Sequence, residues 1–172
     1  MALLAEEVVE EWLNRQGYFT IRGIKLGVHE IDILAFKPDT EGRHECRHIE
    51  VQVSTNPIGY ISKVPKGMGP NSAKERRPEE LEQGIAEWIA KKFDHPKKKA
   101  LRERLFPGDW SRELVVNEVK YSKELDLFSE KGITIHHLKD IVGEMADPRR
   151  PILAAAGNDL FTLMQLGKQQ AE

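Results

Sequence analysis

The stretch "VHEIDILAF", residues 28–36, places an acidic side chain inside an apolar run of the kind that forms a buried strand. Alternation along such a strand puts Ile31, Ile33 and Ala35 on one face and Asp32 on the other. A carboxylate this close to a core is costly unless a partner compensates its charge. The organisation of the chain therefore has to supply a partner for Asp32.

The next apolar stretch, "HIEVQVS" at residues 48–54, has the clearest two-residue period in the chain and predicts a second strand. One face carries Ile49, Val51 and Val53, and the other carries polar residues, namely His48, Glu50, Gln52 and Ser54. A polar connector of hairpin type, residues 37–47, joins the two strands. If they pair, Asp32 and Glu50 come together on one polar face.

The rest of the chain predicts an α/β fold. A helix at 2–16 and a strand at 17–23 come first, with Gly23 and Gly27 marking a turn. After a long loop at about 55–78, the pattern indicates a helix from Glu79 that Pro96 breaks, followed by a strand at 112–121, a helix at 122–132, a strand at 133–138 and a helix at 139–145. This order, αβββαβαβ plus C-terminal helices, predicts a mixed sheet with helices on both faces. We expect one domain, 1–172, ending in a helical extension at about 151–167.

Composition favours a soluble cytoplasmic protein. The chain has 172 residues, a net charge of −2 and a single cysteine, Cys46. It begins with an acidic stretch unlike a signal peptide, and no apolar run approaches the length of a membrane span. With this net charge, any site for a polyanion has to be a local patch.

Carboxylates on neighbouring strands, with an amide beside them, are ligands that Mg²⁺ prefers. Asp32, Glu50 and Gln52 therefore form a candidate site for Mg²⁺ or Mn²⁺. Solvated acids on the outer face of a strand would give the same pattern. In the opening helix, both Glu6 and Glu11 border the apolar stripe, so the helical pattern does not choose between them.

Taken together, these motifs resemble the PD-(D/E)XK nuclease superfamily, closest to its Mrr-like and archaeal Holliday-junction-resolvase-like branch. The resemblance rests on a helix glutamate at Glu6, on "HEID" ending at Asp32 and on "EVQ" beginning at Glu50. It covers residues 6–54, with a looser match to about residue 145. It implies a three-layer restriction-endonuclease-like core and a metal-dependent DNA endonuclease, structure-selective or weakly sequence-specific.

Carried over to this chain, the resemblance implies that Asp32 and Glu50 coordinate Mg²⁺ or Mn²⁺ and that Glu6 assists from the helix. The lysine position of the family is occupied here by Gln52, which cannot carry positive charge. A lysine from elsewhere could supply it, and the nearest in sequence are Lys63 and Lys66.

A segregated set of basic residues predicts contacts to DNA phosphates. It lies in the long loop after the second of these strands and comprises Lys63, Lys66, Lys74, Arg76 and Arg77. A further run, "HPKKKALRER" at 95–104, is equally typical of a solvated helix face. No zinc-finger or helix-turn-helix motif favours sequence-specific reading.

Other features have structural interpretations. Alternation points His136 and His137 to opposite faces, so we expect no shared metal, and Cys46 has no second cysteine for a zinc site. A homodimer follows from the resemblance only. Two alternatives to a nuclease remain open: a catalytically inactive member that binds DNA or a protein partner, which Gln52 favours, and an oligomeric structural or interaction protein assembled through its apolar tail.

Overall fold

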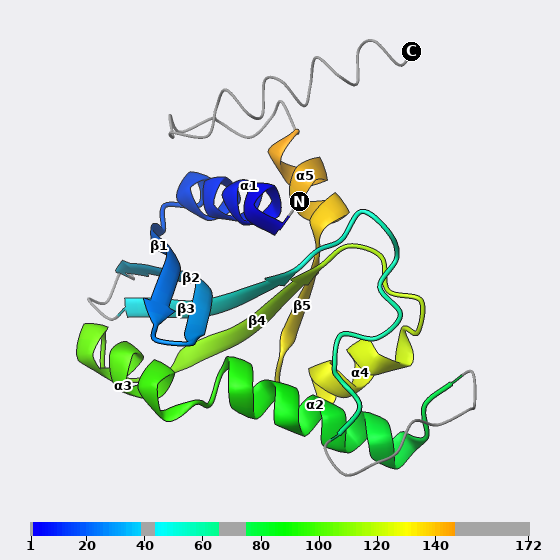
Figure 1. Ribbon diagram of the computed structural model, residues 1–172. Coiled ribbons are helices and arrows are strands. Elements are labelled where there is room, and N and C mark those ends of the chain that lie inside the picture. Colours follow the sequence, from blue (N-terminus) through cyan, green and yellow to red (C-terminus); the bar gives the residue numbers. More distant parts are fainter. Residues whose placement is uncertain (1, 39–43, 66–74, 147–172) are drawn as a thin grey trace, which may run out of the picture.

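The computed structural model describes residues 2–38, 44–65 and 75–146, which form a mixed α/β structure around a five-stranded sheet (Figure 1). The strands lie in chain order and are β1 (Phe19–Leu26), β2 (His29–Pro38), β3 (His44–Gln52), β4 (Trp110–Val116) and β5 (Thr134–His137). The first three pair antiparallel, while β3, β4 and β5 pair parallel. The predicted meander followed by helical crossovers is confirmed.

Helices cover both faces of this sheet (Figure 1). On one face lie α1 (Ala2–Arg15) and α5 (Leu138–Met145), and on the other lie α2 (Pro78–Lys92), α3 (Pro96–Leu105) and α4 (Lys123–Glu130). Two apolar clusters result, one under α1 and α5 and one between β4, α2 and α4. Among the residues described here, no helix is long and apolar enough to span a bilayer.

The two faces of β3 differ in chemistry, as its alternation predicts. Ile49 and Val51 join the apolar cluster under α1. On the opposite face, His48 and Glu50 are polar and yet fully buried. Because buried polar groups need partners, the residues that pack on this face decide what the site can do.

Several predicted boundaries are corrected. Pro96 does not simply break a helix: it is the first residue of α3, where proline is well tolerated. Strand β1 runs through Gly23, and the turn consists of Gly27, which has a φ of 71°, and Val28. The strands containing residues 48 and 112 begin earlier than expected, at His44 and Trp110.

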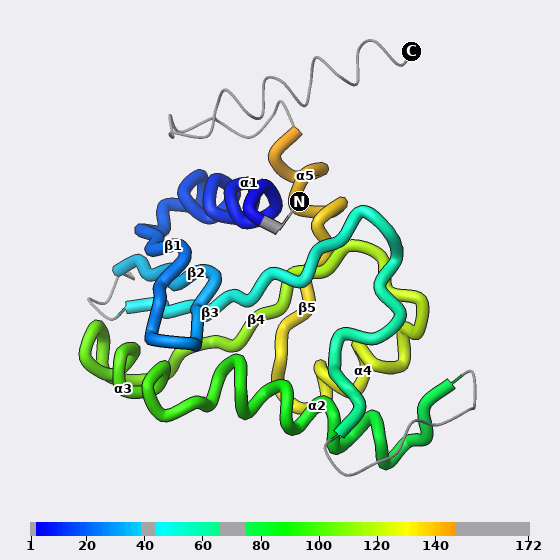
Figure 2. The backbone as a smooth tube through the Cα atoms, viewed as in Figure 1, coloured from blue at the N-terminus to red at the C-terminus, as the bar shows by residue number. Residues whose placement is uncertain are grey.

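Beyond β3, residues 53–65 form no helix or strand and run beside the connection between β4 and α4 (Figure 2). Ile58 bridges to Val119 there. The fully buried carboxylate of Glu124 accepts hydrogen bonds from the backbone N–H groups of Ile61 (2.7 Å) and Ser62 (2.9 Å), and from the Ser62 hydroxyl (2.5 Å). The middle of the predicted loop, 66–74, and the predicted helical extension at 151–167 lie outside the described residues.

Candidate active site

Asp32 and Glu50 lie side by side where β2 and β3 stop pairing. The last paired residues at this end are Ile33 and Ile49. Just beyond them, the backbone N–H of Val51 donates to Asp32 Oδ2 at 2.8 Å. At this position the acceptor for a β3 backbone N–H is the Asp32 side chain and not a β2 carbonyl. This hydrogen bond holds the Asp32 carboxylate next to Glu50. The predicted convergence of these two acids is therefore present.

Glu50 is fully buried and hydrogen-bonded on both oxygens. Oε1 accepts from Lys98 Nζ at 2.9 Å and from His48 Nε2 at 3.0 Å, and Oε2 accepts from Lys92 Nζ at 2.5 Å. These bonds tie β3 to the end of α2 and to the first turn of α3. A buried carboxylate with charge-assisted bonds on both oxygens is held in one orientation.

The protonation state of His48 follows from its two neighbours. Arg102 NH1 lies 2.5 Å from His48 Nδ1, and a guanidinium can only donate. Nδ1 therefore accepts, the proton sits on Nε2, and that N–H donates to Glu50. Burial first, and then the charges of Arg102 and Lys98, hold the pKa of His48 well below its usual range. His48 is therefore a neutral link between Arg102 and Glu50.

Lys92 occupies the space beside both carboxylates. Its Nζ is 2.5 Å from Glu50 Oε2 and 3.9 Å from Asp32 Oδ2. Burial opposes its charge, but the charges of Glu50 and Asp32 outweigh burial and raise the pKa of Lys92. For Lys98, burial is the stronger effect and lowers the pKa. The site thus contains one firmly held ammonium and one that is costly to keep charged.

Asp32 is less well compensated than Glu50. Burial first, and then the nearby charge of Glu50, raise the pKa of Asp32 to about 6, although Lys92 and the Val51 N–H act in the opposite direction. Carboxylates forced together in this way gain from any cation that binds between them. A perturbed acid of this kind is typical of functional sites.

Glu6 and Glu11, which the helical pattern could not separate, have different roles. Glu11 is buried and forms an ion pair with Arg15 at 2.7 Å, so it serves the packing of α1. Glu6 is partly exposed, and burial together with the charge of Asp32 raises its pKa. Glu6 therefore lies within electrostatic reach of Asp32.

Among the described residues, the side chain of Gln52 makes one hydrogen bond, from Nε2 to the carbonyl of its neighbour Val51 at 3.2 Å. The positive charge that Gln52 lacks comes from α2 and α3. Lys63 is exposed and its backbone lies against Gly84, in the middle of α2, and Lys66 lies outside the described residues. The lysines at the site are therefore Lys92 and Lys98.

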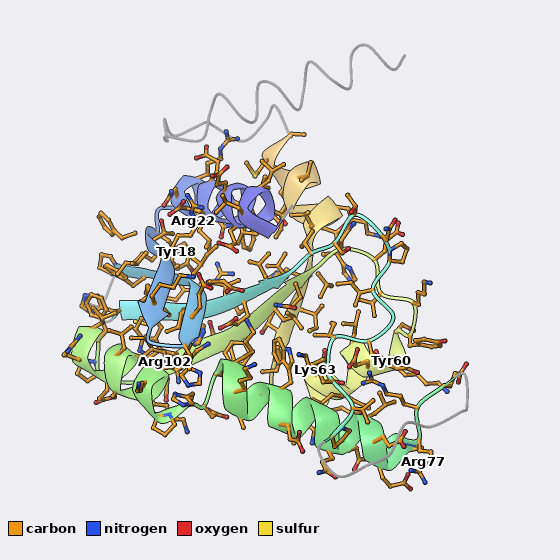
Figure 3. All side chains as sticks on the ribbon, in the orientation of Figure 1. Tyr18, Arg22, Tyr60, Lys63, Arg77 and Arg102 are labelled. Carbon is orange, nitrogen blue, oxygen red and sulfur yellow. The ribbon has the colours of Figure 1, made fainter. Side chains whose placement is uncertain are left out.

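The two other predicted DNA-binding residues that the structure describes, Arg76 and Arg77, lie away from the carboxylates. Arg77 lies at the start of α2 and pairs with Glu80 at 2.8 Å, roughly 20 Å along the helix from Lys92 (Figure 3). Arg76 donates to the Ser62 carbonyl at 2.9 Å and covers the Tyr60 ring. Lys74, like Lys66, lies outside the described residues.

Histidine and cysteine residues elsewhere in the fold have structural surroundings. His136 Nε2 lies 2.7 Å from Glu113, which also pairs with Arg47 under α1. Cys46 is buried and free. Neither residue belongs to the Asp32–Glu50 site.

The residues present fit a hard divalent cation in kind and number. Within the described ranges, no group of three or more His, Cys, Asp or Glu side chains is arranged to hold a metal ion. Mg²⁺, however, commonly takes one or two protein carboxylates and completes its shell with water and phosphate. Asp32 and Glu50 supply such a pair, and a cation there would compete with Lys92 for Glu50 Oε2.

Four site residues escaped the sequence analysis, namely His48, Lys92, Lys98 and Arg102. His48 shares a strand face with Glu50, which is a usable signal. Lys98 and Arg102 are four residues apart and both buried, so they share the inward face of α3. In a run as polar as "HPKKKALRER" nothing distinguishes that face from a solvated one.

Comparisons with known proteins add no family. No protein-family model matches the chain, and no curated protein matches it. The crystal structure of a protein of unknown function, AF1548, superposes with a TM-score of 0.49 at 14% sequence identity, covering 97% of this chain and 79% of that one. The functional argument therefore depends on the site itself.

Proposed function

We propose that this protein is a metal-dependent DNA endonuclease of restriction-endonuclease-like fold, structure-selective or weakly sequence-specific, that hydrolyses phosphodiester bonds with Mg²⁺ or Mn²⁺. The observation that carries the proposal is the convergence of Asp32 and Glu50 beside Lys92, whose Nζ lies 2.5 Å from one carboxylate and 3.9 Å from the other. The paired carboxylates offer oxygen ligands to a cation, and the lysine beside them offers positive charge to a phosphate.

Asp32 and Glu50 would hold the metal. A divalent cation held there would supply a lowered pKa for a coordinated water and positive charge to offset that of the phosphate. Lys92, which is partly exposed, would stabilise negative charge on the phosphate oxygens, a task that the family assigns to the position of Gln52. Buried Lys98 would hold Glu50 in place. Glu6, within electrostatic reach of Asp32, would assist from α1.

The architecture supports this proposal without being specific to it. A helix, an antiparallel meander and parallel strands reached through helices follow in the order that the resemblance implies. Helices cover both faces of the sheet. The site lies at the point where β2 and β3 stop pairing, just beyond the pair of Ile33 and Ile49.

A second candidate is a non-catalytic nuclease-fold protein that binds DNA. The observation that favours it is the same Lys92 ammonium, which already neutralises Glu50 and approaches Asp32. A site with this internal cation can be stable with no metal at all. The two candidates differ in whether a divalent ion displaces Lys92.

The test is a thermal-shift titration with Mn²⁺ on the wild type and on Asp32→Asn, with Asp126→Asn, an exposed aspartate on α4, as the matched control. A ligand that binds only the folded state must raise stability, so the wild type and the control should shift and Asp32→Asn should not. Nicking of supercoiled DNA in Mn²⁺ should follow the same pattern. No shift and no nicking in the wild type would favour the non-catalytic protein.

A further inference from the structure

The tip of the β1–β2 hairpin carries an apolar residue that nothing in the fold explains. Gly27 and Val28 form its two-residue turn, with Leu26 paired to His29. Gly27 has a φ of 71°, as the first position of this kind of hairpin turn requires. The Val28 side chain is 95% exposed, the most exposed large apolar residue described. It lies in the turn directly before β2, four residues before Asp32.

Basic side chains surround this tip. Lys97 Nζ lies 3.6 Å from the position that a Gly27 Cβ would occupy. The rings of His29 and His95 meet with centroids 3.7 Å apart, which fastens the hairpin to the corner between α2 and α3 (Figure 1). Burial, and then the charges of His95 and three lysines, lower the pKa of His29, and these lysines are Lys97, Lys98 and Lys91.

The lysines at this corner form two consecutive pairs. Lys92 and Lys98 are the members of each pair that face the carboxylates. Their neighbours in sequence, Lys91 and Lys97, face solvent. Within the described part of the chain, neither outer lysine has an ion-pair partner, whereas Lys25 on the same hairpin pairs with Glu30 at 2.5 Å. Two uncompensated positive charges therefore stand directly outside the site.

We propose that Lys91, Lys97 and Val28 form the surface on which a DNA strand docks, with its phosphates on the two lysines and a sugar or base edge against Val28. This deepens the proposed function and rests on it, because the surface would place DNA over Asp32 and Glu50. Unpaired lysines contact phosphates without reading sequence. An exposed apolar side chain next to them suits a groove or an unstacked base step.

A protein partner fits these observations less well. An acidic protein surface would be attracted to the lysines but would leave the apolar tip without a complementary pocket at a corner so strongly charged. DNA supplies a row of phosphates and apolar sugar faces in alternation. The chemistry of the surface therefore favours a polyanion with apolar edges.

The experiment measures binding of a short fluorescein-labelled DNA duplex by fluorescence anisotropy over a salt series, in EDTA so that no hydrolysis contributes. Each lost phosphate contact lowers the salt slope by about 0.9. Lys91→Ala/Lys97→Ala should therefore reduce the slope by about 2. The control, Lys123→Ala/Lys131→Ala at the start and just past the end of α4, changes the net charge equally and should leave the slope unchanged. Val28→Ser should weaken binding by roughly threefold to tenfold at an unchanged slope.

The outcomes separate this surface from the proposed hydrolysis. Equal slopes for the two double variants, or wild-type affinity in Val28→Ser, would overturn the surface even if Mn²⁺-dependent nicking is present. Loss of slope in Lys91→Ala/Lys97→Ala with weakened binding in Val28→Ser supports the surface even if no nicking occurs. In that last case the hydrolytic proposal fails alone.

Discussion

At the scale of single residues, the two central acids have been given different environments. Glu50 is enclosed by Lys92, Lys98 and His48, each within hydrogen-bond distance. Asp32 has one backbone donor and a more distant ammonium, and its pKa is raised to about 6. Glu50 is therefore held in one orientation by its partners, while Asp32 is the acid whose raised pKa makes its charge depend on pH.

Asp32→Asn should stabilise the metal-free protein at high pH. The pKa of Asp32 rises from 3.8 to about 6 on folding, so the folded state binds the proton more tightly than the unfolded state. The ionised carboxylate then lowers the free energy of unfolding above pH 6, by roughly 3 kcal/mol at 1.36 kcal/mol per pKa unit, and this penalty disappears below about pH 3.8. Chemical denaturation in EDTA across this range measures the difference.

The matched control is Asp126→Asn, which changes an exposed aspartate of α4 and should leave stability within about 0.5 kcal/mol. A variant Asp32→Asn that is less stable than the wild type above pH 6 would contradict the crowded carboxylate pair. A stability difference between Asp32→Asn and the wild type that stays constant from high to low pH would also contradict it.

His48→Gln should reduce the loss of stability on acidification. A buried neutral His48 has a pKa far below 6.5, so only the unfolded chain takes up this proton as the pH falls. Below pH 6.5, the contribution of His48 therefore lowers the free energy of unfolding of the wild type by up to about 1.4 kcal/mol for each pH unit. Glutamine can still donate to Glu50 and accept from Arg102, and it does not titrate. Urea unfolding at several pH values checks the change in slope, and parallel curves for the two proteins would refute a neutral His48.

The sequence predicts that the two acids converge, but it does not predict which lysines pair with them. Alternation along "HEIDILAF" and "HIEVQVS" was enough to bring Asp32 and Glu50 together, because strand period and hairpin order are local properties. Their cations come from 42 and 48 residues further along the chain, at Lys92 and Lys98. Which lysine of a basic run turns inward depends on tertiary packing, and no local pattern records it.

At the scale of elements, α3 shows how a single proline can be misinterpreted. Pro96 follows a helix and was expected to end regular structure, but proline is also suited to the first turn of a new helix. The helix that follows has almost no apolar residues, so propensity and periodicity give little indication that it packs. It is held to the sheet through Lys98 and Arg102 instead.

Lys98→Ala should therefore destabilise the protein by about 2 to 4 kcal/mol, because it removes one partner from a buried ion pair. Lys98 also donates to the Lys92 carbonyl at 2.7 Å, which links the two helices. Lys97→Ala, one residue away and exposed, is the control and should change stability by no more than about 0.5 kcal/mol. Thermal and urea unfolding measure both. Similar stabilities for the two variants would mean that α3 is not held by Lys98.

The segment after β3 is fixed by one buried carboxylate rather than by secondary structure. Glu124 accepts three hydrogen bonds from Ile61 and Ser62. Glu124→Gln turns an amide group toward these donors and should cost about 2 kcal/mol. Amide hydrogen exchange at Ile61 and Ser62 should accelerate, while amides of β2 exchange as in the wild type. Unchanged exchange at Ile61 would show that this anchor is dispensable.

At the scale of the whole molecule, each face of the sheet combines apolar packing with one buried charged cluster. The face under α1 and α5 carries apolar residues of β2, β3 and β4 together with the buried Arg47–Glu113 pair. On the other face, apolar residues of β4 lie beside the buried polar side chains of Asp32, His48 and Glu50. The polar half is enclosed by α2 and α3, so its charges are neutralised inside the fold. The acids of the site are therefore paired with lysines inside the fold, and under the proposed function a metal that binds between them would have to displace Lys92 from Glu50.

This pairing gives a test that acts on global stability. Lys92→Met removes the ammonium beside both carboxylates, so Asp32 and Glu50 repel without compensation and the metal-free protein should lose about 3 kcal/mol. The same change removes the competitor for Glu50 Oε2, so Mn²⁺ should bind more tightly and raise the melting temperature by more than it does in the wild type. Lys91→Met, which alters the solvent-facing neighbour, should resemble the wild type in both respects. An equal Mn²⁺ shift in Lys92→Met and the wild type would mean that the ion does not bind between these carboxylates, and a smaller shift would mean that Lys92 helps to form the metal site instead of competing for it.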